Sequence, residues 1–286
     1  MLMKLTARKS PVLVMALMAI ASTGVVMAQA AEEEATPPSY SKKGADTCFQ
    51  CHDDQATLAV FRTRHAVPQD PNSPFGHGQL QCEACHGPGG DHAGRVRRGK
   101  ERPAIPAFAS NATTLIEDQN AYCVECHLGD TGFAWHGSSH DDNTVACSDC
   151  HTMHAERDPV LAVSTQAEVC FECHQQQRTQ SMKPYAHPIR QGKMECTSCH
   201  SPHGDDPERL LARSTPNGTC YDCHAEFRGP FLWEHAPAAE DCNNCHNPHG
   251  SNQPGMLSMR APMLCQSCHS QAGHPSLPQD ERGLPG

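Results

Sequence analysis

The sequence is poor in the residues that build an apolar core. Leu, Ile, Val and Phe together make up about 14% of the 286 residues, below the roughly 20% under which a chain is expected to be disordered. Aromatic residues are only 5%, whereas Gly and Pro number 21 and 23. An ordinary domain with a large aliphatic core is therefore excluded, and the chain can fold only if something else supplies buried surface.

Positive charge is also scarce. Lys and Arg number 22 against 32 Asp and Glu, which gives a formal charge of -10. Segment 1–30 contains three basic residues and no acidic residue, so the formal charge of the remaining 256 residues is -13. This excess of negative charge argues against nucleic acid as a partner.

Long apolar runs are missing except at the N-terminus. Lys4, Arg8 and Lys9 precede an apolar run over 11–27, and Ala28-Gln29-Ala30 fits a small-x-small cleavage site. We expect a signal peptide over 1–30 and export to the periplasm; an uncleaved anchor helix is the alternative. Residues 31–46 then form an acidic, polar leader.

Cysteine and histidine, in contrast, are abundant, with 18 and 20 residues. An exported chain with this many cysteines would normally be a disulfide framework, but here every cysteine belongs to a C-x-x-C-H unit. The nine units are Cys48/Cys51/His52, Cys82/Cys85/His86, Cys123/Cys126/His127, Cys147/Cys150/His151, Cys170/Cys173/His174, Cys196/Cys199/His200, Cys220/Cys223/His224, Cys242/Cys245/His246 and Cys265/Cys268/His269.

This spacing is typical of c-type haem attachment. Two cysteines three apart on a helical turn present both sulfurs to one side, where they can form thioethers with the haem vinyl groups, and the adjoining histidine is then an axial iron ligand. A single unit could also be half of a zinc site or a redox dithiol. Nine units with no cysteine left over favour nine covalently attached haems, whose apolar surfaces would replace the missing core.

The second axial ligand is also predicted to be histidine. Eleven histidines lie outside the motifs: His65, His77, His92, His136, His140, His154, His187, His203, His235, His249 and His274. His154, His203 and His249 follow a motif histidine by three residues, too few to reach around a haem, so each should bind the iron of a neighbouring haem. Methionine is the alternative ligand, available as Met153, Met182, Met194, Met256, Met259 and Met263.

Ligation by two histidines leaves an iron no open position, so it favours electron transfer over catalysis, and we predict no catalytic residue. From His140 onward the order histidine, attachment site, histidine, attachment site occurs three times. We therefore expect a nonahaem domain over 47–276, with two-haem modules at about 47–130, 131–180, 181–228 and 229–276 and a tail over 277–286. The expected fold is a multihaem cytochrome c of short α-helices and loops around an elongated row of haems, with essentially no sheet.

A few helix signals stand out. Thr114 with Glu117, and Thr165 with Glu168, have the spacing of capping boxes, and Pro262 can occupy the first turn of a helix before Cys265.

Stretches between the haem sites also carry a family resemblance. From about Tyr40 to Ser276 the chain resembles the decahaem cytochromes of the MtrA/DmsE type, in the segments GADTCFQCH, LQCEACHGPGG, CHTMHAERDPVL, TCYDCHAEFRGPFLWEHAP, CHNPHGS and GMLSMRAPMLCQSCH. The resemblance implies an electron conduit threaded into an outer-membrane β-barrel porin of a Gram-negative bacterium, working toward metal oxides or extracellular dimethyl sulfoxide, or inward from iron oxidation. It also implies an inner-membrane or periplasmic cytochrome as donor and an extracellular multihaem cytochrome or reductase as partner.

The resemblance further implies which histidines are distal ligands. The set is His65, His92, His140, His154, His187, His203, His235, His249 and His274, nine ligands for nine haems. His77 and His136 do not match the family pattern and are expected to be solvated. The family continues past the position of Gly286 into a tenth site, which this sequence does not contain.

Two other functions stay open at this stage. A soluble periplasmic shuttle that supplies a reductase would suit the acidic surface. A multihaem reductase of nitrite or a similar oxyanion would need an open iron, for which the supply of histidines gives no indication.

Overall fold

The computed structural model describes residues 37–109, 111–127, 134–204 and 209–269. The chain divides into two units, Met1–Pro37 and Pro38–Gly286, and nearly all described residues belong to the second. The expected signal peptide, most of the leader, His274 and the tail over 277–286 lie outside the described residues.

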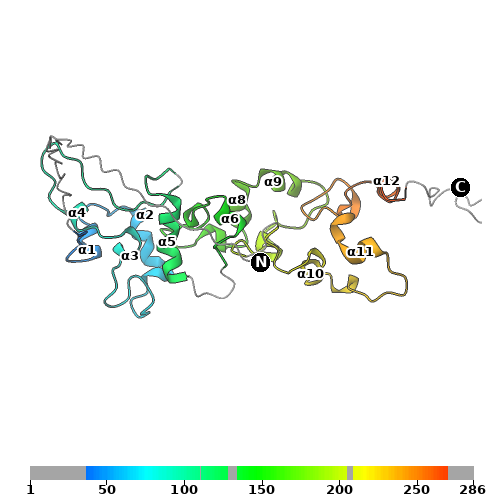
Figure 1. The fold of residues 1–286 in the computed structure, drawn as a ribbon, viewed down its shortest axis with the longest axis horizontal. Coiled ribbons are helices and arrows are strands. Elements are labelled where there is room, and N and C mark those ends of the chain that lie inside the picture. Colours follow the sequence, from blue (N-terminus) through cyan, green and yellow to red (C-terminus); the bar gives the residue numbers. More distant parts are fainter. Residues whose placement is uncertain (1–36, 110, 128–133, 205–208, 270–286) are drawn as a thin grey trace, which may run out of the picture. The chain divides into compact units, whose positions relative to one another are not determined.

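Short helices joined by long loops make up the described part of the chain (Figure 1). Its β-structure is limited to three isolated bridges, Tyr185 with Ser251, His200 with Leu211 and His246 with Leu257. The predicted helix-and-loop fold without a sheet is confirmed. No helix in the described ranges is long and apolar enough to cross a bilayer.

The α-helices are α1 (Ala45–Cys48), α2 (Gln55–Leu58), α3 (Glu83–His86), α4 (Gly90–Ala93), α5 (Ile116–His127), α6 (Ser139–Asp142), α7 (Cys147–Cys150), α8 (Gln166–Phe171), α9 (Gln175–Ser181), α10 (Pro216–Tyr221), α11 (Ala236–Glu240) and α12 (Ala261–Gln266). The 3-10 helices are η1 (Ala59–Arg62), η2 (Arg64–Ala66), η3 (Pro159–Leu161), η4 (Cys196–Ser198), η5 (Ala225–Phe227), η6 (Cys242–Asn244) and η7 (Pro254–Met256).

The predicted capping boxes are wrong, although helices begin close to both of them. The Thr114 hydroxyl accepts the backbone N–H of Ala107 instead of capping α5. The Thr165 hydroxyl donates to the carbonyls of Pro159 and Ala162, because the loop before α8 presents them within reach. Pro262 lies in the first turn of α12, as predicted.

The apolar core of the described residues is small. Its buried side chains are Ala45, Val60, Ala66, Val124, Trp135, Ala146, Ala167, Phe171 and Leu210, of which four are alanines. Buried polar side chains are as prominent, among them Gln119, Asn120, Gln166 and Asn217. The deficit of apolar residues in the sequence therefore reappears as a deficit of apolar packing in the fold.

Candidate functional site

Each C-x-x-C-H unit forms one turn of helix. In eight units the backbone N–H of the histidine donates to the carbonyl of the first cysteine at 2.8–3.0 Å, from Cys48–His52 to Cys265–His269. The remaining unit, Cys123 to His127, lies within α5. The turn brings both cysteines to the same side of the backbone and ends at the histidine, as thioether attachment of one group requires.

Successive attachment units contact one another in the order of the sequence. Thiol hydrogen bonds join the first cysteines of neighbouring units in four pairs, Cys48–Cys82, Cys123–Cys147, Cys170–Cys196 and Cys220–Cys242. The second cysteines interact with the unit that follows, in the pairs Cys85–Cys123, Cys150–Cys170 and Cys199–Cys223. The first eight units therefore form an unbroken series.

In five of the nine units the second cysteine is more exposed than the first, a difference that the spacing alone does not predict. The first cysteine is half-buried in every unit of this series. Among the second cysteines, Cys51, Cys85, Cys126, Cys173, Cys223 and Cys268 are exposed, and Cys150, Cys199 and Cys245 are half-buried. The first cysteine is the more enclosed because it begins the turn and contacts the first cysteine of a neighbouring unit.

Neighbours of the remaining second cysteines vary from unit to unit. Cys126 and Cys173 interact with the second cysteines of the preceding units, Cys85 and Cys150. The carbonyl of Cys245 accepts the backbone N–H of Ser258 at 2.8 Å, and Cys268 Sγ lies 3.8 Å from Ser267 Oγ. The backbone N–H of Cys51 donates to the carbonyl of Cys48 at 3.1 Å within its own turn. Attachment of haem at these five thiols, as at the other thirteen, stays a prediction from the motif.

Buried amide side chains fix three of the contacts between units. Asn120 accepts the backbone N–H of Cys147 at 2.8 Å, and Asn217 accepts that of Cys242 at 2.7 Å. Gln166 accepts the backbone N–H of Thr197, inside the sixth unit, at 3.1 Å. These residues were not predicted from the sequence, although each is an amide three or four residues before the first cysteine of the third, fifth or seventh unit.

Histidine rings face each other in eight pairs. The ring centres lie 6.0–6.3 Å apart, and every pair joins a motif histidine to one of the predicted distal histidines. The pairs, motif histidine first, are His52–His92, His127–His65, His86–His154, His174–His140, His151–His203, His224–His187, His200–His249 and His269–His235.

The pairing connects different attachment units. His154, His203 and His249, which follow a motif histidine by three residues, lie opposite the motif histidines of earlier units. The remaining motif histidine, His246, has no facing ring among the described residues, and His274 lies outside them.

Hydrogen bonds hold many of these rings through Nδ1. Seven backbone carbonyls accept from Nδ1, in the pairs His86–Pro106, His92–Pro103, His140–Pro202, His154–Thr57, His187–Pro248, His200–Arg209 and His246–Gly255, at 2.7–3.2 Å. A ring that donates from Nδ1 is the neutral tautomer with a lone pair on Nε2. Histidines that ligate a metal through one ring nitrogen typically donate a hydrogen bond of this kind from the other.

The facing rings fit a metal ion between them. Metal–imidazole bonds are about 2.0–2.1 Å, so two bonds in line account for about 4 Å of the separation, and the rest is the distance from each ring centre to its nitrogen. A second feature fits a bound group with acceptors. The buried indole N–H of Trp135, whose ring centre lies 6.2 Å from that of His203, has no hydrogen-bond partner among the described residues.

Burial shifts the pKa of several cysteine thiols and histidine rings of the site. Burial raises the pKa of the Cys82 thiol to about 12 and that of Cys150 to about 11, so both thiols are protonated at neutral pH before any group is attached. Burial, and then neighbouring imidazoles, lower the pKa of His65, His203 and His249. These rings are therefore held neutral, which is the form that binds iron.

His77 and His136 lie outside this arrangement. Both are exposed on loops. The side chain of His136 is 69% exposed, and its Nδ1 lies 3.7 Å from a carboxylate oxygen of Asp141.

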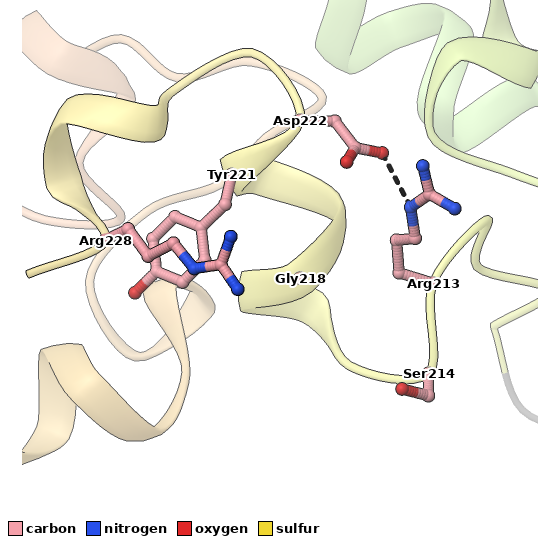
Figure 2. Close-up of a pocket in the computed structure, with 6 residues that line it drawn as sticks. All are labelled: Arg213, Ser214, Gly218, Tyr221, Asp222 and Arg228. Atoms are coloured by element: carbon pink, nitrogen blue, oxygen red, sulfur yellow. Dashed lines mark hydrogen bonds and ion pairs between the residues drawn. The ribbon is translucent and has the colours of Figure 1, made fainter.

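A cationic pocket adjoins the seventh attachment unit (Figure 2). Its volume is about 280 Å³, and its lining comprises Arg213, Ser214, Gly218, Tyr221, Asp222 and Arg228. Arg213 Nε donates to Asp222 Oδ2 at 2.9 Å, and Arg228 and Tyr221 line the same pocket. A guanidinium here can pair with a carboxylate of a group attached at Cys220 and Cys223.

Comparison with known proteins agrees with this geometry. A family described as "Doubled CXXCH motif" matches residues 187–229 and 235–274, and one described as "Cytochrome c-type protein NrfB-like" matches 82–167. The multiheme cytochrome MtrA of Shewanella baltica is 47% identical over 238 residues, which cover 83% of this chain and 69% of that protein.

More distant similarity extends to the cytochrome c-type protein NrfB. The protein of Haemophilus influenzae is 26% identical over 167 residues, 44% of this chain and 74% of its own length. That of Escherichia coli O6:H1 is 30% identical over 137 residues, 46% of this chain and 66% of its own length. The repeated motifs and these relatives establish haem c as the cofactor and electron transfer as the activity. The chain belongs to the MtrA family of multihaem c-type cytochromes.

Proposed function

We propose that this chain holds nine haems between paired histidines and conducts electrons along them, as the cytochrome of an outer-membrane conduit. The observation that carries the proposal is the set of eight imidazole pairs, each of which joins a motif histidine to a histidine outside the motifs. The proposed ninth pair is His246 with His274.

The eighteen cysteines would form thioethers, and the nine motif histidines would bind iron from one side. When bound, haem c supplies an iron that exchanges one electron between its ferric and ferrous forms. The distal histidines close the remaining iron position and so exclude substrate, while the Nδ1 hydrogen bonds fix each ring. Arg213, Arg228 and Trp135 offer donors for haem carboxylates.

An exposed apolar segment supports the proposal that a protein partner binds this chain. Leu232 and Trp233 are 95% and 93% exposed, and the nearby Phe227 and Phe231 are more than half exposed. Exposed apolar groups of this size, close together in the chain, commonly mark an interaction site. We propose that a β-barrel porin covers this segment and places the protein at the outer membrane of a Gram-negative bacterium.

The proposed circuit has two further partners. An inner-membrane or periplasmic cytochrome would exchange electrons at the periplasmic side, and an extracellular multihaem cytochrome or reductase at the outer side. Metal oxides, extracellular dimethyl sulfoxide or ferrous iron would be the terminal reactants. A soluble periplasmic shuttle is the second candidate, favoured by the NrfB-like match over 82–167 and by the excess of acidic residues.

Reconstitution separates the two functions. The holoprotein is combined with a candidate porin in liposomes that enclose a redox dye, and a membrane-impermeant reductant is added outside. A conduit reduces the dye only when porin and cytochrome are both present. A double variant, Leu232→Ser with Trp233→Ser, should keep its haems but lose association with the barrel. No dye reduction, together with rapid reduction of the free protein, would support the shuttle instead.

A further inference from the structure

One motif histidine has a carboxylate as its hydrogen-bond partner at short range. His151 Nδ1 lies 2.6 Å from Asp158 Oδ2, and the side chains are 26% and 10% exposed. His151 is the motif histidine of the fourth attachment unit, and its ring centre lies 6.0 Å from that of His203.

The chain holds this carboxylate in place from its other side. Asp158 Oδ1 accepts the backbone N–H groups of Thr152 at 3.2 Å and of Val160 at 3.3 Å. Pro159 follows directly and begins η3, so the backbone after Asp158 is also restricted. These two donors fix the orientation of the carboxylate and leave Oδ2 directed at the imidazole.

Eight other histidine rings at the described sites lack a carboxylate this close and this buried at Nδ1. Seven of them donate from Nδ1 to a neutral backbone carbonyl. His224 has a carboxylate nearby, but Glu226 Oε1 lies 3.5 Å from its Nδ1, and these side chains are 50% and 61% exposed. Solvent screens that contact far more than the partly buried pair of His151 and Asp158.

We propose that Asp158 is a positioning residue that lowers the reduction potential of the iron bound by His151. The inference rests on the proposed haem ligands and deepens them. A carboxylate that accepts the Nδ1 proton makes the imidazole a stronger electron donor, and a stronger donor stabilises ferric iron over ferrous iron. Reduction at this site takes up one electron, and the Nδ1 proton stays shared between His151 and Asp158.

The position of the site gives this shift a functional consequence. Cys147 of the fourth unit is hydrogen-bonded to Cys123 of the third, and Cys150 interacts electrostatically with Cys170 of the fifth, so the fourth unit is interior to the series. An electron that travels along the series must occupy this iron, and Asp158 therefore sets a thermodynamic barrier within the row rather than at either end.

The test is a spectroscopic redox titration of the full-length holoprotein against the Asp158→Asn variant. Asn keeps the shape but removes the charge, so one of the one-electron components should move to higher potential by about a tenfold change in its equilibrium constant, which is about 59 mV. Asp158→Glu should restore most of the lower potential. The matched control Glu226→Gln should leave the titration unchanged.

Overlapping titrations of wild type and Asp158→Asn would overturn the proposal, and so would an equal shift in Glu226→Gln. Electron paramagnetic resonance of the wild type gives a second test if Asp158→Asn fails to mature. One ferric signal should have the character of imidazolate ligation, and its absence would also overturn the proposal. Haem content and low-spin spectra report on the proposed ligands separately, because they do not depend on Asp158.

Discussion

Asn120 accepts the backbone N–H of Cys147 at 2.8 Å and donates its own amide to the carbonyl of Val145 at 3.0 Å. One buried side chain on α5 thus fixes the start of the next attachment turn, α7. Asn217 repeats the arrangement between α10 and η6, where it donates to Ala238 and Ala239. Hydrogen bonds of this kind maintain contact between successive units where apolar packing is sparse.

Replacing this amide should weaken the holoprotein. Asn120→Ala leaves the N–H of Cys147 without its acceptor, and a buried unpaired group of this kind costs about 1–3 kcal/mol. Denaturant unfolding, followed by the haem absorption, should show a loss of that size. Asn72→Ala is the control because Asn72 is exposed on a loop, and it should change the free energy of unfolding little. Equal stability of the two variants would contradict the role of Asn120.

Removal of a distal histidine should open one iron. In His203→Ala the ring facing His151 is lost, so one of the nine haems should become high-spin while all thioether bonds remain. Electron paramagnetic resonance and the absorption spectrum measure the change. The exposed His77→Ala should retain the wild-type spectrum. A fully low-spin His203→Ala protein would show that another residue binds that iron.

His274→Ala tests the pair that the described residues leave open. His246 donates from Nδ1 to the carbonyl of Gly255 at 2.7 Å, so its Nε2 is available for iron. We expect one high-spin haem in His274→Ala and two in the double variant with His203→Ala, since the two histidines serve different irons. A single high-spin haem in the double variant would contradict this assignment.

Acid should destabilise the fold. Burial, and then neighbouring imidazoles, lower the pKa of His65, His203 and His249 in the folded chain, whereas an unfolded histidine titrates near 6.5. Below about pH 6.5 the unfolded chain therefore binds more protons, and the free energy of unfolding should fall as the pH is lowered further. Denaturant unfolding at pH 7 and pH 5 measures it. Equal or greater stability at pH 5 would contradict the expected loss.

The local parts of the site were predictable from the sequence, because attachment depends on residues within one helical turn. The spacing of Cys147, Cys150 and His151 specifies both the turn and its chemistry. The ring pairs were not predictable individually, since His86 and His154 meet although 67 residues with two other attachment units separate them in the chain. Asn120 and Asp158 were missed for the same reason. A single amide or carboxylate near a motif resembles any polar loop residue until the fold shows what it touches.

Every C-x-x-C-H unit is predicted to carry a haem. Intact mass spectrometry of the protein purified from its native compartment, after treatment with a thiol-alkylating reagent, tests it most directly. The thiols that the reagent would reach first, if they were free, are the exposed ones: Cys51, Cys85, Cys126, Cys173, Cys223, Cys265 and Cys268. We predict the mass of residues 31–286 with nine haems and no alkylated cysteine. A mass with fewer haems, or with alkyl groups on any of the eighteen cysteines, would contradict it.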